Sequence, residues 1–409
     1  MANFKLRSTG KAASADAPAK KKGKTWFSRL NAWLHLWPSL ISGGILVFVC
    51  LTGTLIVYCD EILEYSAGDA RYVSVGKEKA SAEEIIAAVQ QFDPNYQLSQ
   101  MVFFQEANRS MRMRAFHKDT NKLTFIYVNP YTAEVLKADP NAHFFFVTAH
   151  LHSSLLAGEV GHWIVTISTI IFALGCITGL ILWWPKRWTK KTVNDSFTIK
   201  WKARFKRLNY DLHNVYGFYS LLICFILSMT GIFIFFHSVG EVISKAFGGS
   251  SEHVETILPK ADEKRKPQDL AEFAYRALKA HPEKKNAGIW VYNLDKVGAY
   301  AIQLGVAGLK STENFDFVVY NRYTGEEISI ERPYIIHEKV ENTIWQLHMG
   351  QWWGQFGKLS TFLAGIIASS LPITGFLIWW GRRKKKKKTT AARFQKSDRS
   401  SEQVKSALS

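Results

Sequence analysis

The sequence has few cysteines, and none of them has the spacing of a metal-binding or redox motif. Only four occur in 409 residues, and neither C-x-x-C nor C-x-x-C-H is present. Their scarcity argues against covalently attached c-type haem, a zinc site and a disulfide framework. All four lie in or beside apolar stretches and are expected to be small core residues: Cys50, Cys59, Cys176 and Cys224.

The long apolar stretches also lack acidic and basic residues in their interiors. Each has close to the roughly 20 apolar residues that cross about 30 Å of hydrocarbon, which predicts four transmembrane helices. An aromatic fraction of 14%, with 14 Trp, is high for a soluble protein. A cleaved signal peptide is not expected, because the first stretch follows a long basic segment and has no A-x-A site. The stretches are Leu36–Tyr58, Trp163–Trp184, Val215–Phe236 and Leu359–Trp380.

The net charge of +18 could indicate a nucleic-acid partner, but the charges are segregated along the chain. Residues 1–30, 185–212 and 381–409 hold 28 Lys and Arg against 5 acidic residues. Residues 59–161 and 237–357 hold 23 basic and 29 acidic residues. Because Lys and Arg concentrate on the cytoplasmic side, both termini are predicted inside and the two large segments outside. We therefore expect no nucleic acid, and expect Lys384–Lys388 to contact anionic lipid.

An internal repeat singles out four of the twelve histidines. The pattern R-L-N-x-x-L-H at residues 29–35 recurs at 207–213, and Thr-Gly at 52–53 recurs at 230–231, both with a shift of 178. Leu-His at 151–152 recurs at 347–348 and Ile-Thr-Gly at 177–179 recurs at 373–375, both with a shift of 196. In the predicted topology each half of the chain begins inside, crosses to the outside and returns. The two halves therefore have the same orientation, and the repeat is parallel. The histidines at matching places are His35, His152, His213 and His348.

The predicted topology sorts these four histidines into two pairs. His35 and His213 fall near the cytoplasmic face, whereas His152 and His348 fall at the outer face. Ionisable residues close to membrane spans are expensive and are candidates for function. Imidazoles from two helices suit the iron of a b-type haem, so two haems are predicted, one at each face.

Other interpretations of these residues stay open. A transporter could use paired histidines as a proton relay, although the uncharged helix interiors weaken that hypothesis. The Thr-Gly pairs are expected to be helix-packing features or places where a macrocycle approaches the backbone. His150 lies about 200° round a helix from His152, so both cannot face one iron. His237 is a reserve ligand. Five histidines are expected to be ordinary exterior residues: His117, His143, His253, His281 and His337.

The two exterior segments predict small α+β modules. Each opens with a helical pattern, at Ser81–Phe92 with a capping box and at Pro267–Ala280, and continues with alternating strand patterns. Each ends with a turn and strand, at Asn129–Val135 and at Asn321–Glu326. The strand patterns are Gln100–Phe104, Ser110–His117, Leu123–Val128, Gly288–Asn293, Ala299–Leu304 and Phe315–Tyr320.

A helix followed by three strands and this hairpin resembles a PepSY domain, and the Leu-His and Thr-Gly helices around it resemble the PepSY-associated transmembrane helix family. The likeness covers residues 29–383, with Ala133 where the hairpin glycine is usual and Arg322 where the proline is usual. That family is similar to iron-regulated inner-membrane proteins, including ferric-siderophore reductases with two b haems. The resemblance implies that His35, His152, His213 and His348 are haem ligands. It also implies a ferric siderophore, or another ferric complex, as the periplasmic partner.

The sequence thus predicts an α-helical membrane bundle with two exterior PepSY-like modules, and the resemblance implies a dihaem ferric reductase of the cell inner membrane. No G-x-G-x-x-G follows a strand, so the electron donor is a separate quinol or cytoplasmic reductase. The alternatives are the proton-relay transporter and a non-enzymatic regulator that binds a peptide or protease. Between His152 and Trp184 a straight helix would measure about 48 Å, so a bend near Gly158 and Gly161, or a cover from the modules, is expected.

The predicted boundaries follow the charge and hydropathy changes. They are a basic tail at 1–33, the first membrane helix at 34–58, the first module at 59–145, the second helix with its preceding segment at 146–184, a cytoplasmic loop at 185–212, the third helix at 213–236, the second module at 237–340, the fourth helix with its preceding segment at 341–380, and a basic tail at 381–409.

Overall fold

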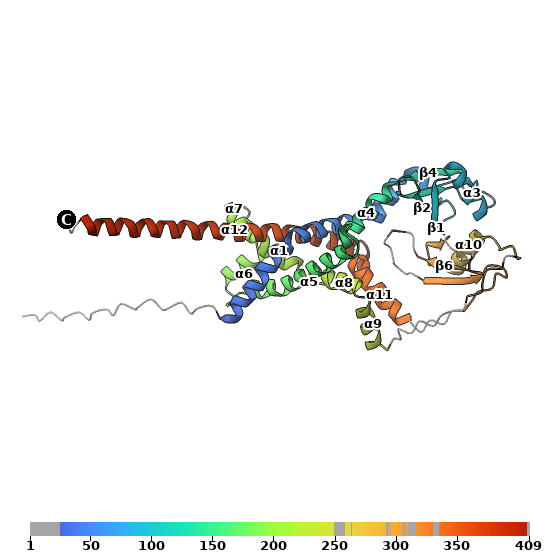
Figure 1. Ribbon diagram of the computed structural model, residues 1–409. Helices are drawn as coiled ribbons and strands as arrows, with labels where there is room; N and C mark the ends of the chain where they lie inside the picture. The colour runs from blue at the N-terminus through green and yellow to red at the C-terminus, as the bar shows by residue number, and fades with distance from the viewer. Residues whose placement is uncertain are drawn as a thin grey trace, which may run out of the picture.

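The computed structural model of the chain is elongated, with a helical bundle at the centre and a sheet domain at one end (Figure 1). It describes residues 25–248, 258–262, 264–291, 294, 296–305, 308–309, 316–329 and 335–406, and beyond residue 383 only the backbone of the last helix. The predicted basic tail before residue 25, the side chains of Lys384–Lys388 and the whole of His253 lie outside the described residues.

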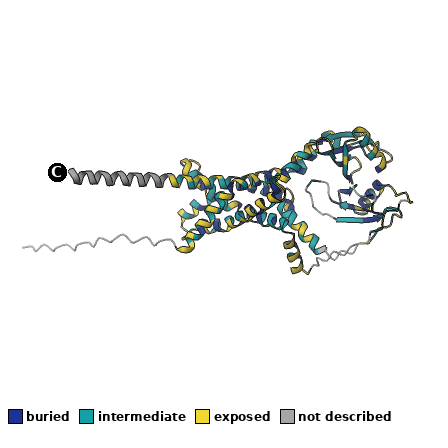
Figure 2. Ribbon diagram, in the orientation of Figure 1, coloured by how far each residue is buried: buried dark blue, intermediate teal, exposed yellow. Residues whose placement is uncertain are grey.

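Four segments of the described chain are helical, long and apolar enough to span a membrane, with mean hydropathy between 1.8 and 2.3. Many of their large apolar side chains face outward, Ile41 with 80% and Leu222 with 67% of its surface exposed (Figure 2). Such exposure suits lipid and would be unfavourable in water. The segments are Trp26–Ile56 (α1), Gly158–Trp183 (α5), Phe205–Phe235 and Gln351–Arg383. The third comprises α7 (Phe205–Asp211), η2 (Leu212–Tyr216) and α8 (Gly217–Phe235), and the fourth η3 (Gln351–Trp353) and part of α12 (Gly354–Ser406).

The helices that carry the outer histidines are separate from the spans that follow them. α4 (Asn141–Ser154) ends at Leu155 and Leu156, both with positive φ (52° and 58°), and α5 begins at Gly158, with φ 55°. α11 (Ile335–His348) ends before Gly350 and Gly354, with φ 71° and 54°. Because residues in the left-handed conformation do not continue an α-helix, the chain turns after α4 and again after α11. The bend expected near Gly158 is therefore confirmed.

The strands of the two exterior segments form one antiparallel sheet of seven strands within the described chain. Its order is β4-β3-β2-β1-β5-β6-β7, so that β1 and β5 pair at the centre and join the two halves. The sequence predicted two modules and did not predict this join. The strands are β1 (Tyr96–Phe104), β2 (Met111–His117), β3 (Leu123–Val128), β4 (Val135–Asp139), β5 (Asn286–Trp290), β6 (Ala299–Leu304) and β7 (Asp316–Asn321).

Each face of the sheet packs against a different layer of helices. On one face, α3 (Ala82–Phe92) and α10 (Leu270–Ala280) bury a continuous apolar core with both halves of the sheet. On the other, Leu123, Phe125 and Tyr127 of β3 pack against α2 (Cys59–Ser66) and α4. The period of two in β3 explains why alternate residues reach opposite layers. This second layer connects the sheet to the outer end of the bundle.

Short features complete the fold. The capping box predicted at Ser81 is confirmed, with Ser81 Oγ accepting from the Glu84 N–H at 3.2 Å. In the two hairpins Gly325 has φ 78°, and Ala133 holds the same left-handed conformation with φ 56° despite its side chain. The remaining short elements are η1 (Gly68–Arg71), α6 (Lys190–Phe197) and α9 (His237–Ala246).

Candidate functional site: two histidine pairs

The four repeat-matched histidines meet as two pairs, as the sequence predicted. The inner pair joins His35 of α1 to His213 of η2, with ring centroids 6.4 Å apart and ring planes at 75°. The outer pair joins His152 of α4 to His348 of α11, with centroids 6.0 Å apart and planes at 46°. All four rings are partly buried. His213 lies in a π-helical turn, a distortion that often occurs at functional sites.

Each histidine is anchored through Nδ1 to a different helix. The inner rings bond to threonine hydroxyls: His35 Nδ1 lies 3.1 Å from Thr178 Oγ1, and His213 Nδ1 lies 2.9 Å from Thr374 Oγ1. In the outer pair, His152 Nδ1 lies 2.9 Å from the Val49 carbonyl oxygen. His348 Nδ1 lies 3.1 Å from both the Leu227 carbonyl oxygen and Thr230 Oγ1.

These anchors assign the tautomer of the inner rings. Thr178 donates its hydroxyl proton to the Leu174 carbonyl at 2.7 Å, and Thr374 donates to Ser370 at 3.0 Å. Each threonine oxygen is then left as an acceptor, so the imidazole Nδ1 must be the donor. His35 and His213 therefore carry their proton on Nδ1.

The outer rings have the same tautomer for a simpler reason. A backbone carbonyl can only accept, so Nδ1 of His152 donates to Val49 and Nδ1 of His348 donates to Leu227. With Nδ1 protonated in all four rings, the ring lone pair lies on Nε2. A neutral imidazole held in this way is the form that ligates a metal.

The Thr-Gly pairs hold the histidine rings. A Cβ placed on Gly53 would lie 2.7 Å from His152 Cε1, and one on Gly179 would lie 3.1 Å from His35 Cε1. On Gly231 and Gly375 the distances to Cε1 of the opposing histidine are 3.1 and 3.2 Å. The sequence predicted helix packing or contact with a macrocycle at these positions. The structure instead places an imidazole against each glycine.

The asparagine of the R-L-N-x-x-L-H pattern adds a second anchor for the inner pair. Asn31 Nδ2 donates to the Thr178 carbonyl at 3.2 Å, and Asn209 Nδ2 donates to the Thr374 carbonyl at 3.0 Å. Both amides are buried. Because each asparagine lies one helical turn before its histidine, the two side chains bind the same Thr residue on the neighbouring helix.

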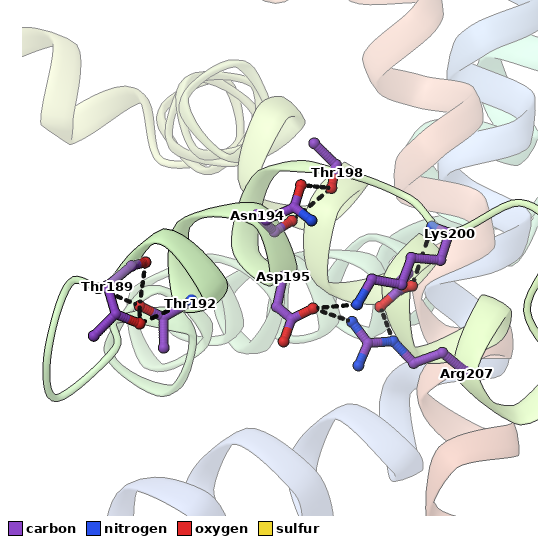
Figure 3. Close-up of polar contacts among 8 residues, drawn as sticks. Thr189, Thr192, Asn194, Asp195, Thr198, Lys200 and Arg207 are labelled. Carbon is purple, nitrogen blue, oxygen red and sulfur yellow. Dashed lines mark hydrogen bonds and ion pairs between the residues drawn. The ribbon is translucent and has the colours of Figure 1, made fainter.

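The loop between α5 and α7 is fixed to the end of the third span by charge. Asp195 accepts from Lys200 at 2.6 Å and from Arg207 at 2.9 Å, and Arg207 also pairs with the fully buried Asp211 at 2.7 Å (Figure 3). Asp211 lies two residues before His213. The network ties α6 to α7, where the third span begins.

The spacing of both pairs suits axial ligation of a haem iron by two imidazoles. A bond of about 2.0–2.1 Å from nitrogen to metal and about 1.1 Å from nitrogen to ring centre place two ring centres about 6.3 Å apart across one ion. The measured 6.4 and 6.0 Å agree with that value. Within the described residues, no three His, Cys, Asp or Glu side chains gather as a metal site, so these pairs offer two ligands each.

The other described histidines have different neighbours. His150 binds the Phe146 carbonyl through Nδ1 at 2.8 Å and does not belong to the outer pair. The side chain of His237, the reserve ligand, lies outside the described residues. Several histidines have acidic or backbone partners: His117 with Asp93, His281 with Glu283, His337 with Glu341, and His143 with the Leu123 N–H.

The sequence did not predict the bond between His152 and the Val49 carbonyl, because a backbone carbonyl is present at every residue and leaves no pattern in the sequence. It also missed Arg114, whose position in the Met-Arg-Met-Arg-Ala run of a strand was a usable signal, because arginine alternates there with buried apolar residues.

Spanning helices that surround paired histidines and support one outer sheet define an integral membrane protein. The family model described as "PepSY-associated TM region" matches residues 32–382, and the chain belongs to that family. No curated protein matches the chain.

Proposed function

We propose that this chain is a dihaem electron-transfer protein of the inner membrane that reduces a ferric complex on the periplasmic side. The observation that carries the proposal is the pair of His–His units, each with a separation suited to one iron and each with Nε2 unprotonated. Haem b, when bound, supplies an iron centre that cycles between Fe(III) and Fe(II) and so passes one electron at a time.

The residues of the chain have separate tasks in this proposal. His35 with His213, and His152 with His348, would supply the axial nitrogens. Thr178, Thr374, Val49 and Leu227 keep the proton on Nδ1 and fix the ring orientation, which also raises the basicity of Nε2. The apolar faces of the four helices exclude water between the two pairs.

The reaction at the outer face is a one-electron reduction of Fe(III) to Fe(II). Oxygen-rich chelators hold Fe(II) less tightly than Fe(III), so reduction assists release of the metal. The electron comes from a separate donor, either a membrane quinol or a cytoplasmic reductase. The orientation that places this donor inside follows from the segregated positive charge.

The direct test is the visible spectrum of the purified full-length protein after reduction with dithionite. A b-type α-band and two haems per chain in a pyridine haemochrome assay are expected. His35→Ala and His348→Ala should each remove one haem, while His162→Ala, which changes a histidine outside both pairs, should retain two.

Absence of the α-band would overturn the proposal and favour either a proton-relay transporter or a regulator that binds a peptide or protease through the sheet. If the band is present, adding a ferric chelate to the reduced protein should reoxidise it, with one Fe(II) formed per electron. Failure of that step would contradict the reductase assignment.

A further inference from the structure

A cavity of about 260 Å³ lies between the sheet and the outer end of the bundle. Its walls are mostly apolar and include Ile56 and Cys59 from the end of the first span and Phe145 and Phe146 from α4. Two polar side chains also line it, Arg114 of β2 and His150 of α4. Figure 1 shows α4 as the element between the bundle and this part of the sheet.

Among the described residues, no acidic side chain forms an ion pair with Arg114. Its guanidinium carbon lies 5.6 Å from the centroid of the Trp290 ring, and no side-chain hydrogen bond or ion pair joins it to another described residue. Its Nε is buried and has no partner within the described residues. Burial, with a smaller contribution from Arg112, lowers the pKa of Arg114. Leaving such a donor unpaired is unfavourable, so an acceptor in the cavity would be strongly preferred.

Two neighbouring arginines contact groups of the protein and do not line the cavity. Arg109 pairs with Glu64 at 2.6 Å. Arg112, two residues away on the same face of β2, lies 4.2 Å from the Phe125 ring centroid and hydrogen-bonds to Tyr127. Of these three arginines, Arg114 is the one that lines the cavity.

The carboxylates close to the cavity are engaged elsewhere. Asp60 accepts from the Leu309 N–H at 2.7 Å, and burial raises its pKa. Glu61 accepts from Lys358 at 2.6 Å and from Gln355 at 3.0 Å. Neither forms an ion pair with Arg114, so the guanidinium is available to a ligand with anionic oxygens.

The cavity adjoins the outer histidine pair through two elements. His150 lies two residues before His152 on α4. Ile56 lies three residues after Gly53, the glycine that contacts His152. The cavity therefore lies at the same end of the bundle as the outer pair, with its lining residue His150 on a different side of α4 from His152.

We propose that this cavity binds the anionic, oxygen-bearing arm of a metal chelate, with the Arg114 guanidinium donating to the chelate oxygens. The inference rests on the proposed function and assigns the place where its ferric substrate docks. Sites that enclose a whole drug-sized ligand occupy about 300–1,000 Å³, so this cavity takes an arm and leaves the rest of the chelate outside. In turnover, one electron from the donor named above reduces the docked Fe(III) to Fe(II), and no bond to the protein forms or breaks.

The test measures binding without electron transfer. Full-length protein in nanodiscs of neutral phosphatidylcholine is titrated with gallium(III) citrate, a redox-inert counterpart of ferric citrate, by isothermal calorimetry. Arg114→Gln should weaken binding at least tenfold and Arg114→Lys less, because lysine keeps the charge but loses the planar fork. Ala149→Phe, which fills the cavity and keeps Arg114, should also weaken binding.

The matched control is Arg276→Gln, which changes an arginine of α10 that also lies over an aromatic ring, 4.8 Å from the Phe273 centroid, on the opposite face of the sheet. It should bind gallium citrate as the unmodified protein does. The thermal unfolding midpoint of each variant shows whether it is folded. If Arg114→Gln does not fold, Arg114→Lys and Ala149→Phe still test the site.

The outcomes separate this inference from the proposed function. Haem-loaded protein that binds gallium citrate independently of Arg114, does not bind it, or binds free citrate equally well would overturn the docking site and leave the haem assignment standing. Protein without haem that shows Arg114-dependent binding of the gallium complex would support the site and overturn the reductase.

Discussion

At the scale of single residues, the recurring unit of this molecule is a histidine held against a Thr-Gly pair of a neighbouring helix. The glycine gives the imidazole room to approach the backbone. Wherever the threonine accepts from Nδ1, its own hydroxyl proton is satisfied by its helix. Because Nδ1 is fixed in all four rings, the direction of Nε2 is set before any ligand binds. This preorganisation lowers the entropy cost of ligation.

Gly53→Ala tests the steric part of this unit. The added Cβ would lie 2.7 Å from His152 Cε1, so the ring must move and the outer pair loses its spacing. One haem per chain is expected in place of two. Gly44→Ala on the same helix is the control, because a Cβ there meets no atom within 4 Å, and it should retain both. Two haems in Gly53→Ala would contradict the proposed role of this glycine.

Thr374→Val tests the hydrogen bond to the inner pair. Valine keeps the shape of threonine but cannot accept the Nδ1–H of His213. Loss of such a supporting bond typically reduces metal affinity about 10–100-fold, and the reduction potential of the inner haem should shift as well. Redox titration and haem retention on dilution measure both. Thr374→Ser should restore them, and Thr169→Val, whose hydroxyl bonds only to Val165 in its own helix, should change neither.

The positions of the site residues were partly predictable from the sequence. Repeat matching selected the histidines and the topology paired them. The Thr-Gly pairs were visible, yet their role was not, because a pattern along one helix does not say which side chain of another helix will meet it. The Val49 carbonyl and the cavity at Arg114 depend on packing between segments far apart in the chain.

At the scale of elements, the outer histidines lie on α4 and α11, which end before the spans begin. Gly158 was expected from the sequence to lie near a bend, whereas no break was predicted at Gly350 or Gly354. Leu155 and Leu156 gave no indication of a break, because leucine rarely adopts positive φ and only the surrounding structure holds it there. The two breaks let α4 and α11 bring their histidines together at the outer end of the bundle.

The Glu61–Lys358 ion pair links α2 to the last span at this same end. Lys358 is 10% exposed and Glu61 36%. Removing one partner of a fully buried pair costs about 3–5 kcal/mol, and screening at the more exposed Glu61 reduces this to about 1–3 kcal/mol for Lys358→Met. Thermal unfolding of the purified protein measures the loss. The double variant Glu61→Gln/Lys358→Met should lose less than the sum of the single changes.

The same pair predicts a pH dependence. Burial acts to raise the pKa of Glu61, but hydrogen bonds from Lys358 and Gln355 outweigh it and hold that pKa below 4.5. Because the unfolded chain then binds protons more readily, the stabilisation is full above the unfolded pKa and is lost as the pH falls through the folded one. The difference in unfolding temperature between the unmodified protein and Glu61→Gln should therefore shrink as the pH falls below the ordinary glutamate pKa. A constant difference from pH 7 to pH 4 would show that Glu61 acts through packing alone.

At the scale of the whole molecule, one sheet couples the two halves of the chain. The pairing of β1 with β5 makes the outer domain continuous, and both helices that cover it share one core. Alternating patterns predicted six of the strands but not this join, since a central strand and an edge strand can have the same pattern. Each half also contributes one histidine to each pair, so neither half holds a complete pair.

The two pairs lie near opposite ends of the first span. His35 and Gly53, which contacts His152, are separated by 18 residues of α1, or about 27 Å at 1.5 Å per residue. That length is close to the hydrocarbon thickness of about 30 Å. In the proposed function, a path for electrons across the bilayer would therefore need both pairs, because neither pair alone lies near both ends of the span.

This requirement can be measured in proteoliposomes that contain trapped ferricyanide and receive dithionite from outside. Loss of the ferricyanide absorbance reports electrons that cross the membrane. The measurement does not depend on the direction in which the protein inserts. We expect His35→Ala and His348→Ala each to slow it at least tenfold, because each removes one ligand from a different pair. His162→Ala, which keeps both pairs, should leave the rate unchanged. A rate that survives both ligand changes would mean that electrons do not cross by way of the histidine pairs, even if haem is bound there.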